Sequence, residues 1–260
     1  MDVLKADKLC ISFGGLAAVK NVSFSIPQGK IVSLIGPNGA GKTTIFNIIT
    51  GFYHGDSGTV ELDGQVINDV SPVKRIDLGM ARTFQNVRLF KQMTALENVM
   101  IGYRRHIRYS VLDSLLRTKR WSEGEREARE ACCDLLERIG LLEDKYNLCS
   151  NLPYGKQKKL EIARALASRP RLLLLDEPAA GLNPQETQEL SVFIQSLPSE
   201  ELSVLLIEHD MSMVMRISDY IYVVNQGELL AEGLPEAVKN NQDVIDAYIG
   251  RGGVKRNAEG

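Results

Sequence analysis

The sequence lacks several features that would place the protein in a specialised class. Its 260 residues include four cysteines, without the density of a disulfide framework or the C-x-x-C spacing of a metal site. No uncharged apolar run approaches the roughly 18 residues that a membrane helix requires, and no N-terminal signal sequence is recognisable. Basic and acidic residues nearly cancel, 31 against 33, so no global field attracts nucleic acid. We therefore expect a globular protein of the reducing cytosol.

Strand-like alternation dominates the first sixty residues. Val22, Phe24 and Ile26 alternate with polar neighbours, and the Asp-Gly pair at 63–64 is typical of a tight β-hairpin. The run IVSLI is continuously apolar, as in a buried parallel strand, and leads through a glycine-rich turn into KTTIFNIIT, which Gly51 can end. The sequence predicts an N-terminal antiparallel β layer beside an α/β core.

The middle of the chain has the texture of helices. In EREAREACCDLLERIG, Cys132, Leu135 and Ile139 share one face and charges occupy the other. We interpret the stretch from about 86 to 165 as a helical subdomain inserted into the core. Further on, LLLLDEP and SVLLIEHD predict buried strands, and IYVVNQGELLAEG predicts a hairpin. Residues 1–250 are expected to form one domain, followed by a disordered tail at 251–260.

The stretch GPNGAGKTT carries the most specific motif. It fits G-x-x-x-x-G-K-[ST] and lies between a predicted strand and a predicted helix. The glycines let backbone N–H groups surround phosphate oxygens, and the helix N-terminus adds partial positive charge. Lys42 is predicted to reach the β- and γ-phosphates, and the Thr43 hydroxyl to ligate Mg²⁺. The predicted phosphate-binding set is Gly36, Pro37, Asn38, Gly39, Ala40, Gly41, Lys42, Thr43 and Thr44.

Two apolar strands deliver candidate catalytic residues. Asp176, at the end of LLLLDEP, is predicted to hold Mg²⁺ through its water shell, and Glu177 to polarise an attacking water. A solvated carboxylate pair at a strand terminus is the alternative. LLIEHD places His209 at the end of another strand, where an imidazole could contact the γ-phosphate or the water. The predicted catalytic residues are thus Lys42, Glu177 and His209.

The order of motifs resembles that of the ATP-binding cassette (ABC) ATPases over nearly the whole chain. The matching stretches are FGG, GPNGAGKTT, RTFQ, LPYGKQKKLEIARAL, LLLLDEP, GLNP and IEHD. The resemblance implies an α/β P-loop NTPase core with ATP and Mg²⁺ as cofactors. It also implies that Phe13 stacks on adenine, with a core aromatic as the alternative, and that Gln85 ligates Mg²⁺ and senses the γ-phosphate.

The signature loop of that family, L-S-G-G-Q, is altered in this chain to LPYGK. In the family this loop opens a helix whose N-terminus faces the ATP of a second subunit. The resemblance therefore assigns Tyr154, Gly155 and Lys156 to the partner's ATP, while Pro153 removes the serine hydroxyl. Asn183 stands where the family usually has Asp. Both departures argue against two equal ATP sites in a symmetric dimer.

Within the family, the chain is similar to the ATPase subunits of branched-chain amino acid importers. The implied partners are a second ATPase subunit, two membrane permease chains and, indirectly, an external solute-binding protein, with no nucleic acid. The implied location is peripheral, at the cytoplasmic face of the inner membrane. No residue contacts the solute, so urea and amides stay open. The alternative from another class is an ABC ATPase of a soluble assembly, such as iron–sulfur cluster building.

Two stretches are candidate contact surfaces. Between residues 101 and 120 lie six Lys or Arg and one acid, which indicates either a solvated helix face or contact with anionic lipid heads. The apolar residues after Gln85 are predicted to border a groove for a permease helix. They are Leu89, Phe90, Met93 and Leu96.

Overall fold

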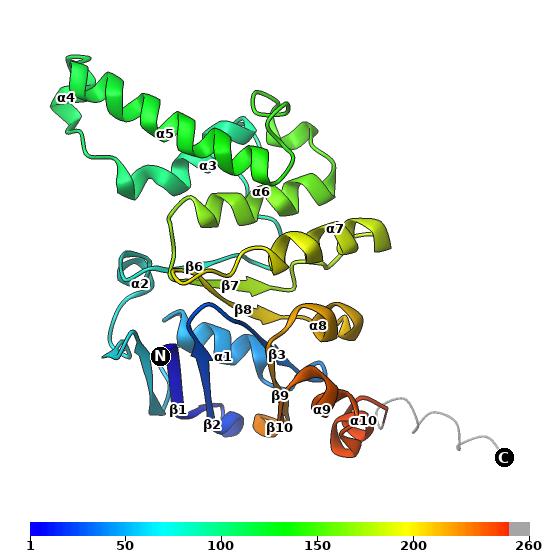
Figure 1. Ribbon diagram of the computed structural model, residues 1–260. Helices are drawn as coiled ribbons and strands as arrows, with labels where there is room; N and C mark the ends of the chain where they lie inside the picture. Colours follow the sequence, from blue (N-terminus) through cyan, green and yellow to red (C-terminus); the bar gives the residue numbers. More distant parts are fainter. Residues whose placement is uncertain (250–260) are drawn as a thin grey trace.

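Two sheets and a helical region are stacked along the molecule (Figure 1). The computed structural model describes residues 1–249, so the tail predicted at 251–260 lies outside the described residues. In Figure 1 the helices α3 to α6 lie at one end, and strands β6, β7, β8 and β3 of the larger sheet lie in the middle. Strands β9 and β10 of that sheet lie at the other end, together with β1 and β2 of the smaller sheet. This arrangement confirms the predicted fold class.

The smaller sheet is antiparallel, with strand order β2-β1-β4-β5. Its strands are β1 (Asp2–Phe13), β2 (Leu16–Pro27), β4 (Ser57–Leu62) and β5 (Gln65–Val66). Asp63 and Gly64 have φ angles of 50° and 76°, as a type I′ hairpin turn between β4 and β5 requires. The hairpin and the N-terminal β layer that the sequence predicts are both confirmed.

The larger sheet has the order β10-β9-β3-β8-β7-β6, and only its β9–β10 pair is antiparallel. Its strands are β3 (Ile31–Ile35), β6 (Met80–Arg82), β7 (Leu172–Asp176), β8 (Ser203–Ile207), β9 (Tyr220–Asn225) and β10 (Glu228–Gly233). Every residue of β3, β7 and β8 is buried, as in parallel strands covered on both faces. Their carboxyl ends therefore meet at one edge of the sheet.

Helices cover both faces of the larger sheet. α1 (Lys42–Ile49) lies between the two sheets, and its Ile45, Phe46 and Ile49 belong to a core that includes residues of both. The opposite face packs against residues of α7 (Pro184–Gln195) and α8 (Met211–Ile217). The remaining helices of this part are α2 (Pro72–Asp77), α9 (Pro235–Lys239) and α10 (Gln242–Ile249).

The helical region has a hydrophobic core of its own. It contains α3 (Ala95–Tyr103), η1 (Arg104–His106), α4 (Val111–Leu115), α5 (Lys119–Arg138), η2 (Cys149–Asn151) and α6 (Tyr154–Leu166). α6 contributes Leu160 and Ala163 to this core, but Ile162 and Leu166 to the core on the sheet. Because α6 serves both cores, the subdomain boundary near residue 165 stays a prediction. Within residues 1–249 no helix has the length and apolar character to cross a bilayer.

Candidate nucleotide-binding site

A cavity of about 860 Å³ lies at the carboxyl edge of the parallel strands. This is the place where α/β sheets bind ligands, because the loops that follow the strands converge there. Its lining brings together segments that are far apart in the sequence. The predicted site residues that line it are Asn38, Gly39, Ala40, Gly41, Lys42, Thr43, Thr44, Gln85, Glu177 and His209.

The loop between β3 and α1 folds tightly around the Lys42 ammonium. Lys42 is 7% exposed, and its Nζ donates to the carbonyl oxygens of Gly36 at 2.6 Å and Pro37 at 3.0 Å. Burial lowers the pKa of Lys42, and the carboxylates of Glu177 and Asp176 partly offset this effect. Gly41 has a φ of 106°, and a Cβ there would lie 2.7 Å from a backbone oxygen, so only glycine fits.

Asp176 ends β7 and forms a buried ion pair. Its Oδ2 accepts from Arg82 Nη2 at 2.8 Å, and the two side chains are only 8% and 9% exposed. Arg82 also donates from Nη1 to Asn47 Oδ1 at 2.8 Å and Thr50 Oγ1 at 3.1 Å. Asp176 is not among the described residues that line the 860 Å³ cavity. Our sequence reasoning missed Arg82, although it stands in the same RTFQ stretch as Gln85.

Three aromatic rings surround the Arg82 guanidinium. Its carbon lies 5.6, 5.8 and 5.1 Å from the ring centroids of Phe46, Phe52 and Phe84. These contacts are within the range of cation–π attraction, which stabilises a cation in surroundings that few water molecules reach. Arg82 Nε is a buried donor without a hydrogen-bond partner among the described residues, and the surrounding rings offset part of the cost of leaving it unpaired.

Glu177 lies at the point where the predicted catalytic residues meet. Its φ of 46° is left-handed, a conformation that costs a residue with a side chain about 1–3 kcal/mol and that occurs mainly at functional sites. Its Oε2 accepts from Gln85 Nε2 at 2.7 Å and lies 3.7 Å from His209 Nδ1. The structure therefore brings Gln85, Glu177 and His209 together, as the sequence suggested.

A buried lysine on α6 connects the segment that carries Gln85 with the segment that carries Glu177. Lys158, on α6, is 2% exposed and donates from Nζ to Gln85 O at 2.7 Å and, at 3.4 Å, to Glu177 O. Burial lowers the pKa of Lys158, while the carboxylates of Glu161 and Glu208 raise it in part. Sequence reasoning missed Lys158, because its spacing from Leu160 and Ile162 does not mark it as a buried residue.

Glu208 is a second group that sequence reasoning missed. It is fully buried, and its Oε1 accepts from Ala179 N at 2.8 Å, while its Oε2 accepts from His209 N at 3.1 Å. Burial raises the pKa of Glu208, although these backbone donors lower it in part. The carboxylate thus fixes the loop after β7 relative to the loop that carries His209.

The donor set fits a magnesium ion held mainly by a nucleotide. Residues 1–249 contain no group of three or more His, Cys, Asp or Glu side chains placed to hold a metal. Mg²⁺ keeps several waters and binds proteins through a few oxygen ligands plus substrate phosphates, so it does not need such a cage. Thr43 and Gln85, which line the cavity, could supply the direct ligands, and Asp176 an outer one.

Phe13 lies near the cavity but is not part of its described lining. Its ring is half exposed at the end of β1 and meets Tyr53 edge-on, with centroids 5.3 Å apart. The large apolar residue that does line the cavity is Leu16, which is 75% exposed. Stacking of Phe13 on adenine stays a prediction.

The altered signature loop lies outside the described lining of the chain's own cavity. α6 begins at Tyr154, with Pro153 as its N-cap, and Tyr154 and Gly155 are outside the described cavity lining, as is Lys156. Lys156 Nζ pairs with Asp144 Oδ2 at 2.6 Å, so its charge is already shared within the chain. This position suits a contact with another molecule.

Asn183, which departs from the family pattern, has a local role. Its side chain accepts from Glu186 N at 2.9 Å, and the Glu186 side chain accepts from Asn183 N, which forms a capping box at the start of α7. The substitution therefore keeps the start of α7 intact.

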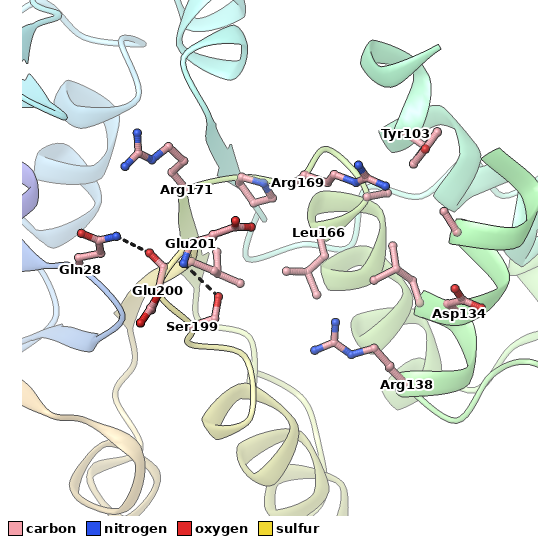
Figure 2. A pocket seen from close by; sticks show the side chains of 15 residues that line it. Gln28, Tyr103, Asp134, Arg138, Leu166, Arg169, Arg171, Ser199, Glu200 and Glu201 are labelled. Atoms are coloured by element: carbon pink, nitrogen blue, oxygen red, sulfur yellow. Dashed lines mark hydrogen bonds between the residues drawn. The ribbon is translucent and has the colours of Figure 1, made fainter. Parts of the chain in front are cut away.

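A second cavity, of about 720 Å³, lies between the helical region and the opposite edge of the larger sheet (Figure 2). Charges of both signs surround it, including Arg138, Arg169 and Glu201. Gln28 closes one side by donating to the Glu200 carbonyl. None of the predicted site residues lines this cavity in the described chain, so we place the nucleotide in the first cavity.

Comparisons with known proteins agree with this geometry. A family model described as ABC transporter matches residues 19–180, and one described as branched-chain amino acid ATP-binding cassette transporter matches residues 228–254. The high-affinity branched-chain amino acid transport ATP-binding protein BraF of Pseudomonas aeruginosa is 49% identical over 249 residues, covering 95% of this chain and 98% of that protein.

Solved structures share the fold. The ADP conformation of an ATP-binding cassette of an ABC transporter has a TM-score of 0.84 and 33% identity, covering 96% of this chain and 99% of the other. A dimeric ATP-binding cassette in a post-hydrolysis state, bound to ADP and Pi, has a TM-score of 0.74 and 25% identity, covering 89% and 98%.

Proposed function

Because the chain belongs to the ABC transporter family, we propose that it hydrolyses ATP to energise the uptake of branched-chain amino acids through separate permeases. The observation that carries this proposal is the convergence of Lys42, Gln85, Glu177 and His209 on one cavity. The solute is supported by the relatives alone, since no residue of the site recognises an amino acid. The subunit would lie peripherally at the cytoplasmic face of the membrane, with an external solute-binding protein supplying the solute.

The contacts around Glu177 suggest how the site works. Lys42 would exchange its two loop carbonyl partners for the β- and γ-phosphates of ATP, and Thr43 would bind the Mg²⁺ that neutralises their charge. Gln85 donates to Glu177 Oε2, one of the two carboxylate oxygens that can accept a proton from water. Release of Gln85 would free this oxygen to accept the proton, and His209 would then orient the water or the γ-phosphate.

Two substitutions separate binding from chemistry. Lys42→Ala should abolish ATP binding, because it removes the cation that meets the phosphates. Glu177→Gln should keep binding but lose about a hundred- to ten-thousand-fold in turnover, as expected for a general base. Glu130→Gln, on the exposed face of α5, is the matched control. Near wild-type turnover of Glu177→Gln in the assembled complex would show that another group is the base.

The signature loop supports pairing with a second, distinct ATPase subunit. Pro153 has neither a hydroxyl nor a backbone N–H, so two possible phosphate donors are missing. Lys156 shares its charge with Asp144, which leaves less of it for a partner's ATP. Each hydrogen bond to a charged group contributes about 1.5–3 kcal/mol, so the ATP site that faces this loop should close more weakly.

Steady-state hydrolysis tests this asymmetry. The isolated chain should be slow, and adding a cognate ATPase subunit with a serine-containing loop, together with the permeases, should raise the rate markedly. Pro153→Ser should raise the rate of the isolated chain. If the isolated chain matches the complex and Pro153→Ser changes nothing, the loop does not limit the reaction.

An apolar groove is our candidate site for a permease helix. A cavity of about 400 Å³ is lined by side chains that include Phe52, Val73, Ile76 and Phe84, and Phe52, Val73 and Ile76 are 55%, 72% and 46% exposed. The segment predicted from the sequence is only partly suitable. Phe90 is half exposed, but the prediction for Leu96 was wrong, because it is 2% exposed in the core of the helical region.

Copurification with the permeases tests the groove. Val73→Asp should reduce copurification and uptake while ATP binding persists, because the charge would lie in an apolar contact. Phe90→Asp tests the neighbouring segment in the same way. Loss of ATP binding together with copurification would indicate misfolding, and unchanged uptake in both variants would place the contact elsewhere.

A further inference from the structure

The outermost point of the helical region exposes a cluster of large apolar side chains. Val111, Leu112, Leu115 and Leu116, in and beside α4, are 84%, 68%, 77% and 72% exposed. In Figure 1 α4 lies at the outer end of α5, far from the sheets. Such clustering differs from the scattered apolar residues of ordinary surfaces and marks a contact site.

Local contacts hold this segment in its exposed position. Ser110 and Asp113 form a capping box at the start of α4, and Thr118 donates to the second oxygen of Asp113 at 3.0 Å. Tyr109 packs so closely on Gly124 of α5 that a Cβ there would lie 2.7 Å from its ring. The apolar side chains are therefore presented by a folded element.

The charge around this cluster is strongly positive. Residues 104–120, which we call the α4 tip, contain six Lys or Arg and a single acid, Asp113, whose carboxylate is engaged in the capping box. The rest of α5 has the opposite balance, with three Arg and six acids between residues 121 and 139. Positive charge thus coincides with the exposed apolar residues and ends with them.

A basic cavity of about 550 Å³ lies beside the exposed cluster. Four arginines line it, together with two acids, Glu123 and Glu127. The arginines are Arg105, Arg108, Arg120 and Arg169. Guanidinium groups match the oxygens of a phosphate in geometry and charge, so the cavity suits a phosphate group.

The base of the α4 tip contacts an element of the permease groove. Arg105 donates to the backbone oxygens of Ile76 and Asp77 at the end of α2, at 2.7 Å for Asp77. Ile76 lines that groove. In Figure 1 α4 and α2 also lie on the same side of the drawing. A permease docked in the groove would bring this side of the chain to a membrane.

We propose that the α4 tip binds the anionic phospholipid surface of the membrane. The four apolar side chains would enter the acyl boundary, and the arginines of the basic cavity would bind headgroup phosphates. A protein partner would need a surface that is both apolar and acidic, whereas an anionic membrane offers apolar chains and phosphates together. The proposal rests on the proposed function in one respect, because only a transporter subunit would lie close to a membrane. A vesicle assay without permeases tests lipid binding separately.

Binding of the full chain to vesicles provides the test. We expect it to sediment with phosphatidylcholine vesicles that contain phosphatidylglycerol and not with phosphatidylcholine alone. The chain has one tryptophan, Trp121, in the first turn of α5, so a blue shift of its emission would report the contact directly. Binding should weaken with salt, because the Debye length falls from about 10 Å at 0.1 M to about 3 Å at 1 M.

Variants separate the apolar and the ionic contributions. Replacing Leu112 and Leu115 by Asn should weaken binding about tenfold or more, because each leucine side chain that enters the membrane adds to the hydrophobic free energy of binding. Replacing Arg108 and Arg120 by Gln should weaken it about 25-fold, at about fivefold per cation. Leu234→Asn, at a residue 63% exposed outside the α4 tip, is the control and should bind as wild type.

Three results would overturn the proposal. They are equal binding to both vesicle types, binding that both double variants retain, and loss of binding in the Leu234→Asn control. If the wild type ignores vesicles but the leucine variant no longer copurifies with permeases, the tip binds protein instead. Hydrolysis in the assembled complex tests the proposed function independently, so either idea can fail without the other.

Discussion

Replacing Arg82 by methionine tests what holds Asp176, the carboxylate that we propose as an outer ligand of Mg²⁺. In the wild type, Arg82 Nη2 donates to Asp176 Oδ2 at 2.8 Å, with both side chains less than a tenth exposed. Methionine keeps a long apolar side chain against Phe46, Phe52 and Phe84 but removes the charge. Asp176 would then be a buried carboxylate without its cationic partner.

The expected loss is large because the pair is buried. Removing one partner of a buried ion pair costs about 3–5 kcal/mol, mainly because the other charge stays buried without compensation. The hydrogen bonds to Asn47 and Thr50 are lost as well. Leaving these two acceptors unpaired costs less than leaving the Asp176 carboxylate unpaired, because they are neutral. We expect Arg82→Met to lower the free energy of unfolding by about 3–5 kcal/mol.

Urea unfolding with and without ATP and Mg²⁺ measures this effect. The deficit of Arg82→Met should shrink when both are present, because the bound cation would supply positive charge near Asp176 and would bind the folded state only. The control is Arg126→Met, which breaks a pair with Glu130 whose side chains are 68% and 62% exposed. Exposed pairs contribute about 0–1 kcal/mol, so this control should unfold almost as the wild type does.

A deficit below about 1 kcal/mol for Arg82→Met would refute this reasoning, because it would place the pair in the range of exposed ones. A full deficit that ATP and Mg²⁺ leave unchanged would refute the role of Asp176 at the metal, while preserving its role in stability.

Lys158→Met removes the donor to two backbone carbonyls and keeps the apolar stem, so ATP turnover should fall while equilibrium ATP binding persists. Alkylation of the native chain at about pH 8 should spare Cys132 and Cys149, because burial raises their pKa, to about 12 for Cys132; mass spectrometry should find both modified only after unfolding. Burial raises the pKa of Glu208 above 4.5, so its contribution to stability is complete below pH 4.5 and is lost as pH rises through the folded-state pKa. Glu208→Gln should therefore flatten this fall in urea unfolding across a pH series.

The sequence predicted those parts of the fold that depend on local patterns. Continuous apolar runs identified β3, β7 and β8, and the Asp-Gly turn identified the β4–β5 hairpin, because burial and turn geometry leave a direct mark on residue type. The loop around Lys42 was recognisable for the same reason. Glu177 and His209 followed from their places at strand ends.

Contacts between distant segments could not be predicted in this way. Arg82 meets Asp176, 94 residues away, and Lys158 meets the Gln85 carbonyl, 73 residues away, and no local pattern specifies either pair. Leu96 is a different kind of error. It lies three residues before Val99, the spacing of one helix face, so its burial in the helical core was a periodic signal that we overlooked.

The position of Lys158 has a consequence for the timing of events at the site. Its hydrogen bond to Gln85 O, at 2.7 Å, is much shorter than the one to Glu177 O, at 3.4 Å. If the helical region swung away from the sheet, the longer bond would break first, and Gln85 would travel with α6 while Glu177 stayed on the sheet. The side-chain bond between Gln85 and Glu177 would then part as well. A movement of α6 away from the sheet would therefore free Glu177 Oε2 before water attacks the γ-phosphate, and Lys158 is the side chain that would couple the two events.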